Sequence, residues 1–484
     1  MQERYTQLAP DFKISRLLTG LWQIADMERD GQSLNLEQAA QYMEEYTEAG
    51  LITFDMADHY GSAELIAGIF GKTPAGNKAQ FFTKWVPDVQ AKREKETVRK
   101  AIELSLQRLQ QDQLDLLQYH AWNYADPAWL DDLFWLQELK EEGLIRHLGL
   151  TNFDAAHLNM VLESGIQVIS NQVSYSLLDQ RASGGLSAVC QKHGVHLLAY
   201  GTLAGGLLSD KWLGQPERPV DQMDTWSQMK YKRFLDIAGG WASLQKLLQT
   251  LRSIADEHGI SIANVATKYI MEQHAVGGVI VGARLGQSKH IKDNLKLFDF
   301  TLSDANLQSI EGVIQGFQPI PGDCGDEYRK PPFLTSAGDL RHHFTHFPPP
   351  YPVKEKGAGR AQALSGTIWE DLAGFSRAIK QGDRILVSGT TATHGDKMIG
   401  GDDPAAQAHF VLDKIEGAIQ SLGGKLEDVV RTRVYIQNMN DWEPISRAHG
   451  QRFAHIQPAN TLIRADLIGD GYLVEMEAEA VIRS

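Results

Sequence analysis

Four residues whose side chains could move protons follow short apolar runs in the first quarter of the chain. Asp55 and Tyr60 come after residues 51–54, Lys84 after 81–83, and His120 after 114–119. A tyrosine hydroxyl with an ordinary pKa near ~10 needs a neighbouring cation to act as an acid or base at neutral pH. We expect Lys84 to stabilise the Tyr60 phenolate, and Asp55 to keep Lys84 charged and in place. His120 would hydrogen-bond an oxygen atom lying between it and Tyr60.

The apolar runs that carry these residues belong to a longer alternation of strand-like and helix-like segments. From Leu17 to about residue 314, this pattern is typical of a parallel sheet with crossover helices. Eight strands are expected, at residues 17–20, 52–54, 81–83, 114–119, 147–150, 168–170, 196–199 and 279–281. The count predicts an α/β fold, a (β/α)8 TIM barrel. In such a barrel the C-terminal strand ends, where the four residues lie, form the site.

The strings around the four residues resemble those of a known superfamily. "FDMADHYG", "FFTKW" and "LDLLQYHAW" are similar to the catalytic tetrad regions of the aldo-keto reductases, with Asp55, Tyr60, Lys84 and His120 in the matching positions. The resemblance implies an NAD(P)-dependent oxidoreductase, an alcohol or aldose dehydrogenase, that transfers hydride between nicotinamide and an aldehyde, ketone or sugar. Tyr60 would be the general acid or base. No metal would be required.

The same resemblance supplies cofactor contacts, since no Gly-x-Gly-x-x-Gly follows a predicted strand. Thr151, Asn152 and Gln172 match residues that bind the nicotinamide carboxamide, and Tyr200 matches the aromatic residue that stacks on the ring. Further matching positions are Gly20 and Trp22, then Gly201, Thr202, Leu203, Gly205 and Leu207 for the pyrophosphate, and Gly282, Arg284, His290, Asp293 and Asn294 for the adenosine phosphate. Arg284 with Lys289 or His290 could clamp a 2′-phosphate, which favours NADP(H) while leaving NAD(H) open.

Aromatic residues just beyond three strand ends are candidates for a substrate pocket: Trp22, Trp85, Trp122 and Tyr124. The alternative for each is packing beneath a loop. The segment from Gly205 to about Trp241 is too long for an ordinary loop of this fold and predicts a lid or binding loop. Cys190 and Cys324 lack a partner at metal-ligand spacing and are interpreted as structural thiols.

Two other functions remain open. A nicotinamide-binding sensor or partner subunit would have little turnover, although it would not need Tyr60. A Schiff-base lyase would use Lys84 as its nucleophile, although the neighbouring Asp55 favours the charged ammonium over the neutral amine.

A second domain follows a proline-rich stretch that holds eight of the seventeen prolines. We expect the barrel at residues 1–316, an extended linker at 317–359 and an α+β domain at 360–484. "ILVSG", "VVRTRVYIQNMNDW" and "YLVEMEAEAVI" resemble the Rid (YjgF-like) family of chorismate-mutase-like domains. Relatives assemble as trimers, which implies a homo-oligomer. The string Pro458-Ala459-Asn460 lacks the arginine that holds a substrate carboxylate in that family, so an oligomerising or ligand-binding role is expected instead of imine deamination.

Composition limits the partners. A net charge of −14 argues against a nucleic-acid or anionic-membrane surface, because both require basic patches. The chain has neither an apolar run of ~20 residues nor an apolar leader, so a cytoplasmic protein is expected. The predicted partner is a small carbonyl or alcohol substrate.

Overall fold

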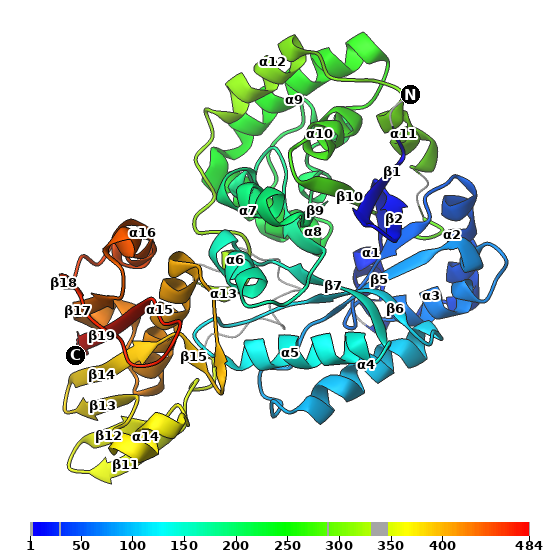
Figure 1. The fold of residues 1–484 in the computed structure, drawn as a ribbon. Coiled ribbons are helices and arrows are strands. Elements are labelled where there is room, and N and C mark those ends of the chain that lie inside the picture. The colour runs from blue at the N-terminus through cyan, green and yellow to red at the C-terminus, as the bar shows by residue number, and fades with distance from the viewer. Residues whose placement is uncertain (1–2, 29–30, 288–289, 331–346, 484) are drawn as a thin grey trace.

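The computed structural model describes residues 3–28, 31–287, 290–330 and 347–483. Its larger part is a closed barrel of eight parallel strands, in the order β10-β3-β4-β5-β6-β7-β8-β9 (Figure 1). This confirms the predicted (β/α)8 architecture. The strands are β3 (Leu17–Gly20), β4 (Thr53–Asp55), β5 (Gln80–Trp85), β6 (Leu114–Tyr119), β7 (Ile145–Thr151), β8 (Ser170–Ser174), β9 (His196–Tyr200) and β10 (Val276–Gly282).

A two-stranded hairpin that the sequence reading did not include lies against the barrel. Strands β1 (Tyr5–Ala9) and β2 (Phe12–Ser15) pair antiparallel. Phe12 and Ile14 of the hairpin share one buried cluster with inward-facing barrel residues such as Phe82 and Leu116. The hairpin therefore contributes to the apolar filling that makes the barrel a packed core.

The helices surround the strands and bury one apolar stripe each. In α9, Leu244, Leu247, Leu248 and Leu251 recur at the three- and four-residue spacing of one helix face, and all are buried. The helices of this part are α1 (Trp22–Met27), α2 (Leu36–Glu48), α3 (Ala63–Gly71), α4 (Lys95–Leu109), α5 (Ala128–Glu141), α6 (Ala155–Glu163), α7 (Gly185–His193), α8 (Trp226–Ala238), α9 (Gly240–His258), α10 (Ile262–Met271), α11 (Ile291–Leu295) and α12 (Asp304–Ile314). Helix α8 lies inside the predicted lid segment.

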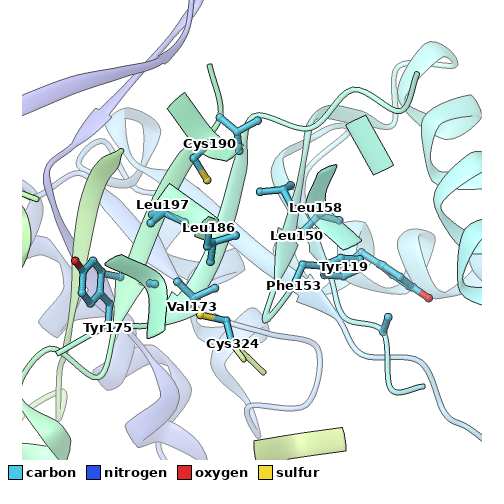
Figure 2. Close-up of a cluster of buried hydrophobic side chains, with 14 of the residues drawn as sticks. Tyr119, Leu150, Phe153, Leu158, Val173, Tyr175, Leu186, Cys190, Leu197 and Cys324 are labelled. Atoms are coloured by element: carbon cyan, nitrogen blue, oxygen red, sulfur yellow. The ribbon is translucent and has the colours of Figure 1, made fainter. Parts of the chain in front are cut away.

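The two cysteines are free and buried. Figure 2 shows Cys190 beside Leu186 and Leu197, and Cys324 near Val173. Burial raises the pKa of Cys190 to about 12, so its thiol stays protonated at neutral pH.

The stretch predicted as a linker differs from that prediction at both of its ends. Residues 326–329 form the short helix α13 (Asp326–Arg329), and Glu327 and Arg329 are buried against the barrel. At the other end, β11 (Val353–Gly357) pairs with β12 (Arg360–Ala363) and so belongs to the C-terminal sheet. The prolines of this stretch interrupt the local sequence periodicity, so neither contact could be predicted from the sequence.

The C-terminal domain is a seven-stranded sheet in the order β11-β12-β13-β14-β19-β17-β18. Along β19 (Val474–Val481), buried Val474, Met476, Ala478 and Ala480 alternate with glutamates at 475, 477 and 479, so one face is covered and the other is not. The predicted α+β fold is confirmed. The remaining elements are β13 (Ala378–Gln381), β14 (Arg384–Thr391), β17 (Val429–Ile436), β18 (Ala459–Arg464), the pair β15 (Thr393–His394) and β16 (Lys397–Met398), and helices α14 (Ile368–Ala373), α15 (Pro404–Ser421) and α16 (Trp442–Phe453).

The two domains contact each other through α15 and α6, and His394 of β15 lies 2.8 Å from Asp131 of α5 (Figure 1). Gly417 of α15 lies so close to the loop after β6 that a Cβ atom there would be 2.2 Å from the carbonyl oxygen of Ala125. No helix among the described residues has both the length and the apolar character to cross a membrane.

Candidate active site

A buried ion pair forms the base of the site. Lys84, on β5, donates from Nζ to Asp55 Oδ2 at 2.7 Å and to the carbonyl oxygen of Met56 at 2.8 Å. The other Asp55 oxygen accepts from the side-chain amides of Gln118, at 3.0 Å, and Gln172, at 2.7 Å. Asp55, Lys84 and Gln118 lie near the C-terminal ends of the neighbouring parallel strands β4, β5 and β6. Parallel pairing of these strands therefore brings the side chains together at one face of the barrel. The carboxylate is therefore held by three donors.

Lys84 lies next to Tyr60. Its Nζ is 4.9 Å from the centre of the Tyr60 ring. Burial lowers the pKa of Lys84, and the charge of Asp55 opposes that change. A cation at this distance favours the ionised form of a phenol, which is the property a tyrosine acid requires near neutral pH.

Aromatic rings enclose the Tyr60 side of the site. The Trp22 ring lies 4.9 Å from that of Tyr60 in an edge contact, and the Trp122 ring lies 4.5 Å from that of His120. Trp122 is fixed further by a hydrogen bond from Nε1 to the carbonyl oxygen of Pro87, at 2.9 Å. Such walls are suited to the apolar part of a carbonyl compound or the face of a sugar ring.

These residues line one cavity of about 650 Å³. The cavity brings together the predicted tetrad and nearly all predicted cofactor residues. The predicted residues that line it are Gly20, Trp22, Asp55, Tyr60, Lys84, His120, Trp122, Thr151, Asn152, Gln172, Tyr200, Gly201, Thr202, Leu203, Gly205, Gly282, Arg284, His290, Asp293 and Asn294.

Three predicted residues lie elsewhere. Trp85 and Tyr124, expected at the substrate pocket, and Leu207, expected at the pyrophosphate, are buried outside the described lining of the cavity. The Trp85 ring packs 5.6 Å from Tyr119, because successive strand residues face opposite sides of the barrel wall. Tyr124 turns inward and stacks on His157. The structure therefore does not place Trp85 and Tyr124 at this cavity.

The loop after β9 offers a backbone cradle. Gly201 has φ +69°, and a Cβ atom there would be 1.9 Å from the hydroxyl oxygen of Tyr231, so only glycine fits. Gly205 also has a positive φ, of +66°. Thr202 Oγ1 and Gln23 Oε1 line the cavity without a hydrogen-bond partner in the described part of the chain. A bound dinucleotide would supply partners for such groups, so the residues present fit one.

At the far end of the cavity, Arg284 donates to Asp26 Oδ2 at 2.5 Å. Asp293 accepts from the Ser261 hydroxyl at 2.8 Å. His290 and Asn294 line the same end, whereas Lys289 lies outside the described residues. The guanidinium of Arg284 is thus at the cavity wall, paired with the carboxylate of Asp26.

Several lining or supporting residues were not predicted from the sequence, among them Tyr328, Lys230, Gln118 and His59. Tyr328 of α13 accepts a hydrogen bond from Lys230 Nζ at 2.5 Å, and its hydroxyl is 3.3 Å from that of Tyr200. Gln118 supports Asp55, and His59 lines the cavity. A four-residue helix is too short to show helical periodicity, so α13 could not be predicted from the sequence. Lys230 lies in the predicted lid segment, and the sequence does not indicate where that segment lies in the folded chain.

Comparison with known proteins matches the two parts of the chain to two families. The family model described as "Aldo/keto reductase family" matches residues 16–315, and that described as "Endoribonuclease L-PSP" matches residues 369–482. An uncharacterized protein of Streptomyces coelicolor is 38% identical over 117 residues, which cover 24% of this chain and 87% of that protein. "Protein tas" of Escherichia coli is 30% identical over 250 residues, covering 47% and 70%. The solved structure of glycerol dehydrogenase AKR11B4 from Gluconobacter oxydans has a TM-score of 0.55 at 24% identity, covering 67% of this chain and 98% of its own.

Proposed function

The chain belongs to the aldo-keto reductase family, with a Rid/YjgF-type domain at its C-terminal end, and from this premise we propose that it reduces a small carbonyl compound with a nicotinamide cofactor. The observation that carries the proposal is the Lys84–Asp55 ion pair beside Tyr60 in a cavity that also holds His120. A reduced nicotinamide bound there would supply the hydride that forms the new C–H bond.

Tyr60 then provides the proton. As the carbonyl carbon gains the hydride, its π electrons move to the oxygen, which takes the hydroxyl proton of Tyr60. Lys84 stabilises the phenolate that remains, and a proton from solvent restores the hydroxyl. His120 donates to the substrate oxygen and orients it. A positioned acid of this kind contributes about 10²–10⁴-fold in rate. In the reverse direction the same groups oxidise an alcohol.

The cofactor residues are proposed in the same way. Asn152 and Gln172 would hold the carboxamide, Tyr200 the ring, and the cradle at Gly201 the pyrophosphate. Arg284 supports NADP(H) as the preferred cofactor, because a guanidinium binds the 2′-phosphate with paired hydrogen bonds. That choice requires Arg284 to exchange its Asp26 contact for the phosphate.

Cofactor binding and turnover test this function. Fluorescence titration with NADPH and NADH measures affinity, and loss of reduced nicotinamide absorbance against small aldehydes and sugars measures turnover. Tyr60→Phe should abolish turnover and keep NADPH affinity. Tyr435→Phe, on the C-terminal sheet, is the matched control and should change neither. Binding without turnover, unaltered in Tyr60→Phe, would favour a sensor, and loss of all binding would refute both functions.

For the C-terminal domain we propose self-association through the uncovered face of its sheet. Leu386 and Ile463 are 41% and 48% exposed there, and β19 adds three glutamates. Asn460 donates to the Thr432 hydroxyl at 2.9 Å on the covered side, which supports the expectation that it does not replace a substrate-binding arginine. Sedimentation of the whole chain should report an oligomer, and Leu386→Glu should dissociate it. A monomeric wild-type chain would refute this role.

A further inference from the structure

Asn152 is held in an unusual conformation at the end of β7. Its φ is +61°, in the left-handed region that non-glycine residues seldom adopt. Its N–H donates to the carbonyl oxygen of Gln172 at 2.8 Å, and its side-chain oxygen accepts from the Tyr200 hydroxyl at 2.8 Å. Its own carbonyl oxygen accepts from Arg329 Nη1 at 2.7 Å. Such a conformation persists only where the surroundings determine it, and here one determinant comes from outside the barrel repeat.

Arg329, on α13, connects two loops of the active face. Besides Asn152, its guanidinium bonds the carbonyl oxygen of Ala121, the residue after His120, from Nε at 2.8 Å. Arg329 is buried, and its Nη2 has no hydrogen-bond partner within the described residues. One rigid, planar group therefore sets the distance between the loop of His120 and the loop of Asn152.

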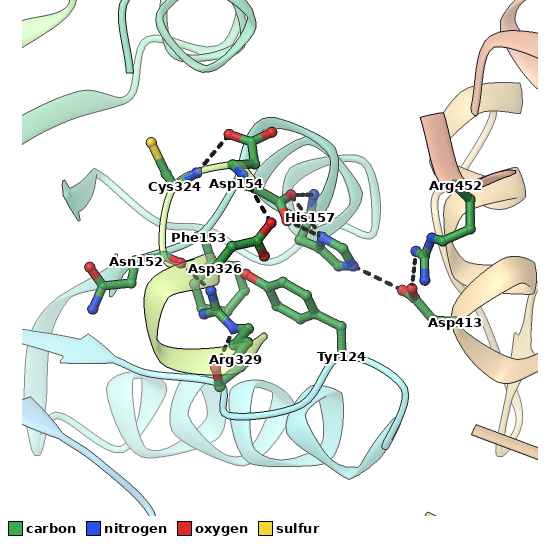
Figure 3. Close-up of polar contacts among 12 residues, drawn as sticks. Tyr124, Asn152, Phe153, Asp154, His157, Cys324, Asp326, Arg329, Asp413 and Arg452 are labelled. Carbon is green, nitrogen blue, oxygen red and sulfur yellow. Dashed lines mark hydrogen bonds and ion pairs between the residues drawn. The ribbon is translucent and has the colours of Figure 1, made fainter. Parts of the chain in front are cut away.

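The guanidinium rests on an aromatic ring that is itself supported from the second domain. The Arg329 carbon Cζ lies 4.3 Å from the centre of the Tyr124 ring. The His157 ring stacks on Tyr124 at 3.4 Å and 9°. Figure 3 shows Tyr124 between the two groups. Stacking of this kind helps to fix the plane of the Arg329 guanidinium.

His157 bridges the domains. Its Nδ1 is 2.7 Å from Asp154 Oδ1 on the barrel, and its Nε2 is 2.9 Å from Asp413 Oδ2 on α15. Arg452 of α16 binds Asp413 in turn (Figure 3), and it also binds Glu416. The His157 and Asp413 side chains are only 6% and 1% exposed, so this ion pair between the domains is shielded from water.

We propose that the C-terminal domain is a positioning part of the barrel's site. Asp413 holds the His157 ring, and that ring supports Tyr124. Arg329, lying on Tyr124, then keeps the loops of His120 and Asn152 in register. The predicted effect on cofactor binding rests on the proposed reductase function. The predicted effect on the two loops can be measured without cofactor or turnover.

The charge of His157 makes the contact sensitive to pH. Burial by itself lowers the pKa of His157, but Asp154 and Asp413 outweigh burial and raise it to about 9. The charged and titratable groups that face this ring are Asp154 on its own helix, Asp413 and His409 on α15, Arg452 on α16, and Tyr124 and Arg329 from the barrel side. Burial lowers the pKa of His409 to about 4, so it is neutral throughout the relevant range. At neutral pH, His157 is an imidazolium between two carboxylates.

Hydrogen–deuterium exchange of the full chain tests the geometric claim. Asp413→Asn removes one carboxylate from His157 and should raise exchange about 10-fold in barrel peptides 119–126 and 148–158. Asp403→Asn is the matched control. Asp403 lies at the same interface, 3.2 Å from Asn159 Nδ2, and an asparagine keeps its N-cap of α15. The control should leave both peptides unchanged. Equal exchange in the two variants would overturn the proposal.

Cofactor affinity supplies a second test of the proposal. Arg329→Lys keeps the charge but cannot bond both carbonyl groups in one plane, so NADPH affinity should fall about 10-fold with the chain still folded. Wild-type chain at pH 10, after correction for the intrinsic rise of amide exchange with pH, should exchange like Asp413→Asn, because His157 has then lost its charge. Wild-type affinity in Arg329→Lys would overturn the proposal. If the wild type binds no cofactor, the reductase function fails, and the exchange result still decides the geometric claim.

Discussion

Raising the pH should weaken the fold through His157. The pKa of its imidazole is about 9 in the folded chain and 6.5 as the ordinary value. A difference of about 2.5 corresponds to about 3 kcal/mol, because one pKa unit is worth about 1.36 kcal/mol. Since the folded pKa is the higher one, this stabilisation is complete below pH 6.5 and is lost as the pH rises through 9. The attraction that raises the pKa of His157 also lowers that of Asp154, so the two describe one interaction and are not added.

The assay is urea unfolding of wild type and His157→Gln between pH 6 and pH 10. The difference between their free energies of unfolding should be about 3 kcal/mol larger at pH 6 than at pH 10. Taking the difference between the two proteins cancels the pH-dependent contributions of other titratable groups, notably Lys414. Burial lowers the pKa of Lys414 to about 7, so this lysine gives stability that rises with pH over the same range. A difference that does not vary with pH would refute the account of the His157 contact.

Three further results are expected. Lys84→Met should lower kcat by about 10²–10⁴-fold in steady-state assays, since Tyr60 loses its cation, and wild-type kcat would contradict the role of the pair. Gly201→Ala should weaken NADPH binding in fluorescence titration, because its Cβ would overlap the Tyr231 hydroxyl; unchanged affinity would exclude a cofactor role for that loop. Trp122→Ala should raise KM for aromatic or sugar substrates more than for small aldehydes, and an equal change for all substrates would mean that Trp122 does not contact them.

The barrel and the tetrad could be predicted because strand period and strand ends are local properties of the sequence. Strand-like runs at residues 81–83 and 114–119 mark β5 and β6, and parallel pairing then places Lys84 and His120 on one face. The same rule could not say which side of the wall a residue beyond the strand faces. Trp122 faces the cavity and Tyr124, two residues later, faces the core.

What remained hidden depends on contacts between distant segments. Arg329 reaches Ala121 across 208 residues and Asn152 across 177, and no local pattern encodes either contact. The bridge from His157 to Asp413 spans 256 residues and required both domains to be folded. Short edge strands such as β11, all of whose residues are exposed, carry no apolar alternation and were read as linker.

The central claim is that Tyr60 donates the proton as hydride is transferred. Single-turnover stopped flow with NADPH and its 4-deuterated form, in wild type and Tyr60→Phe, measures that step directly. The account predicts a wild-type rate that slows with deuterium and falls by about 10²–10⁴-fold in Tyr60→Phe at unchanged cofactor affinity. A hydride-transfer rate in Tyr60→Phe equal to that of the wild type would contradict it.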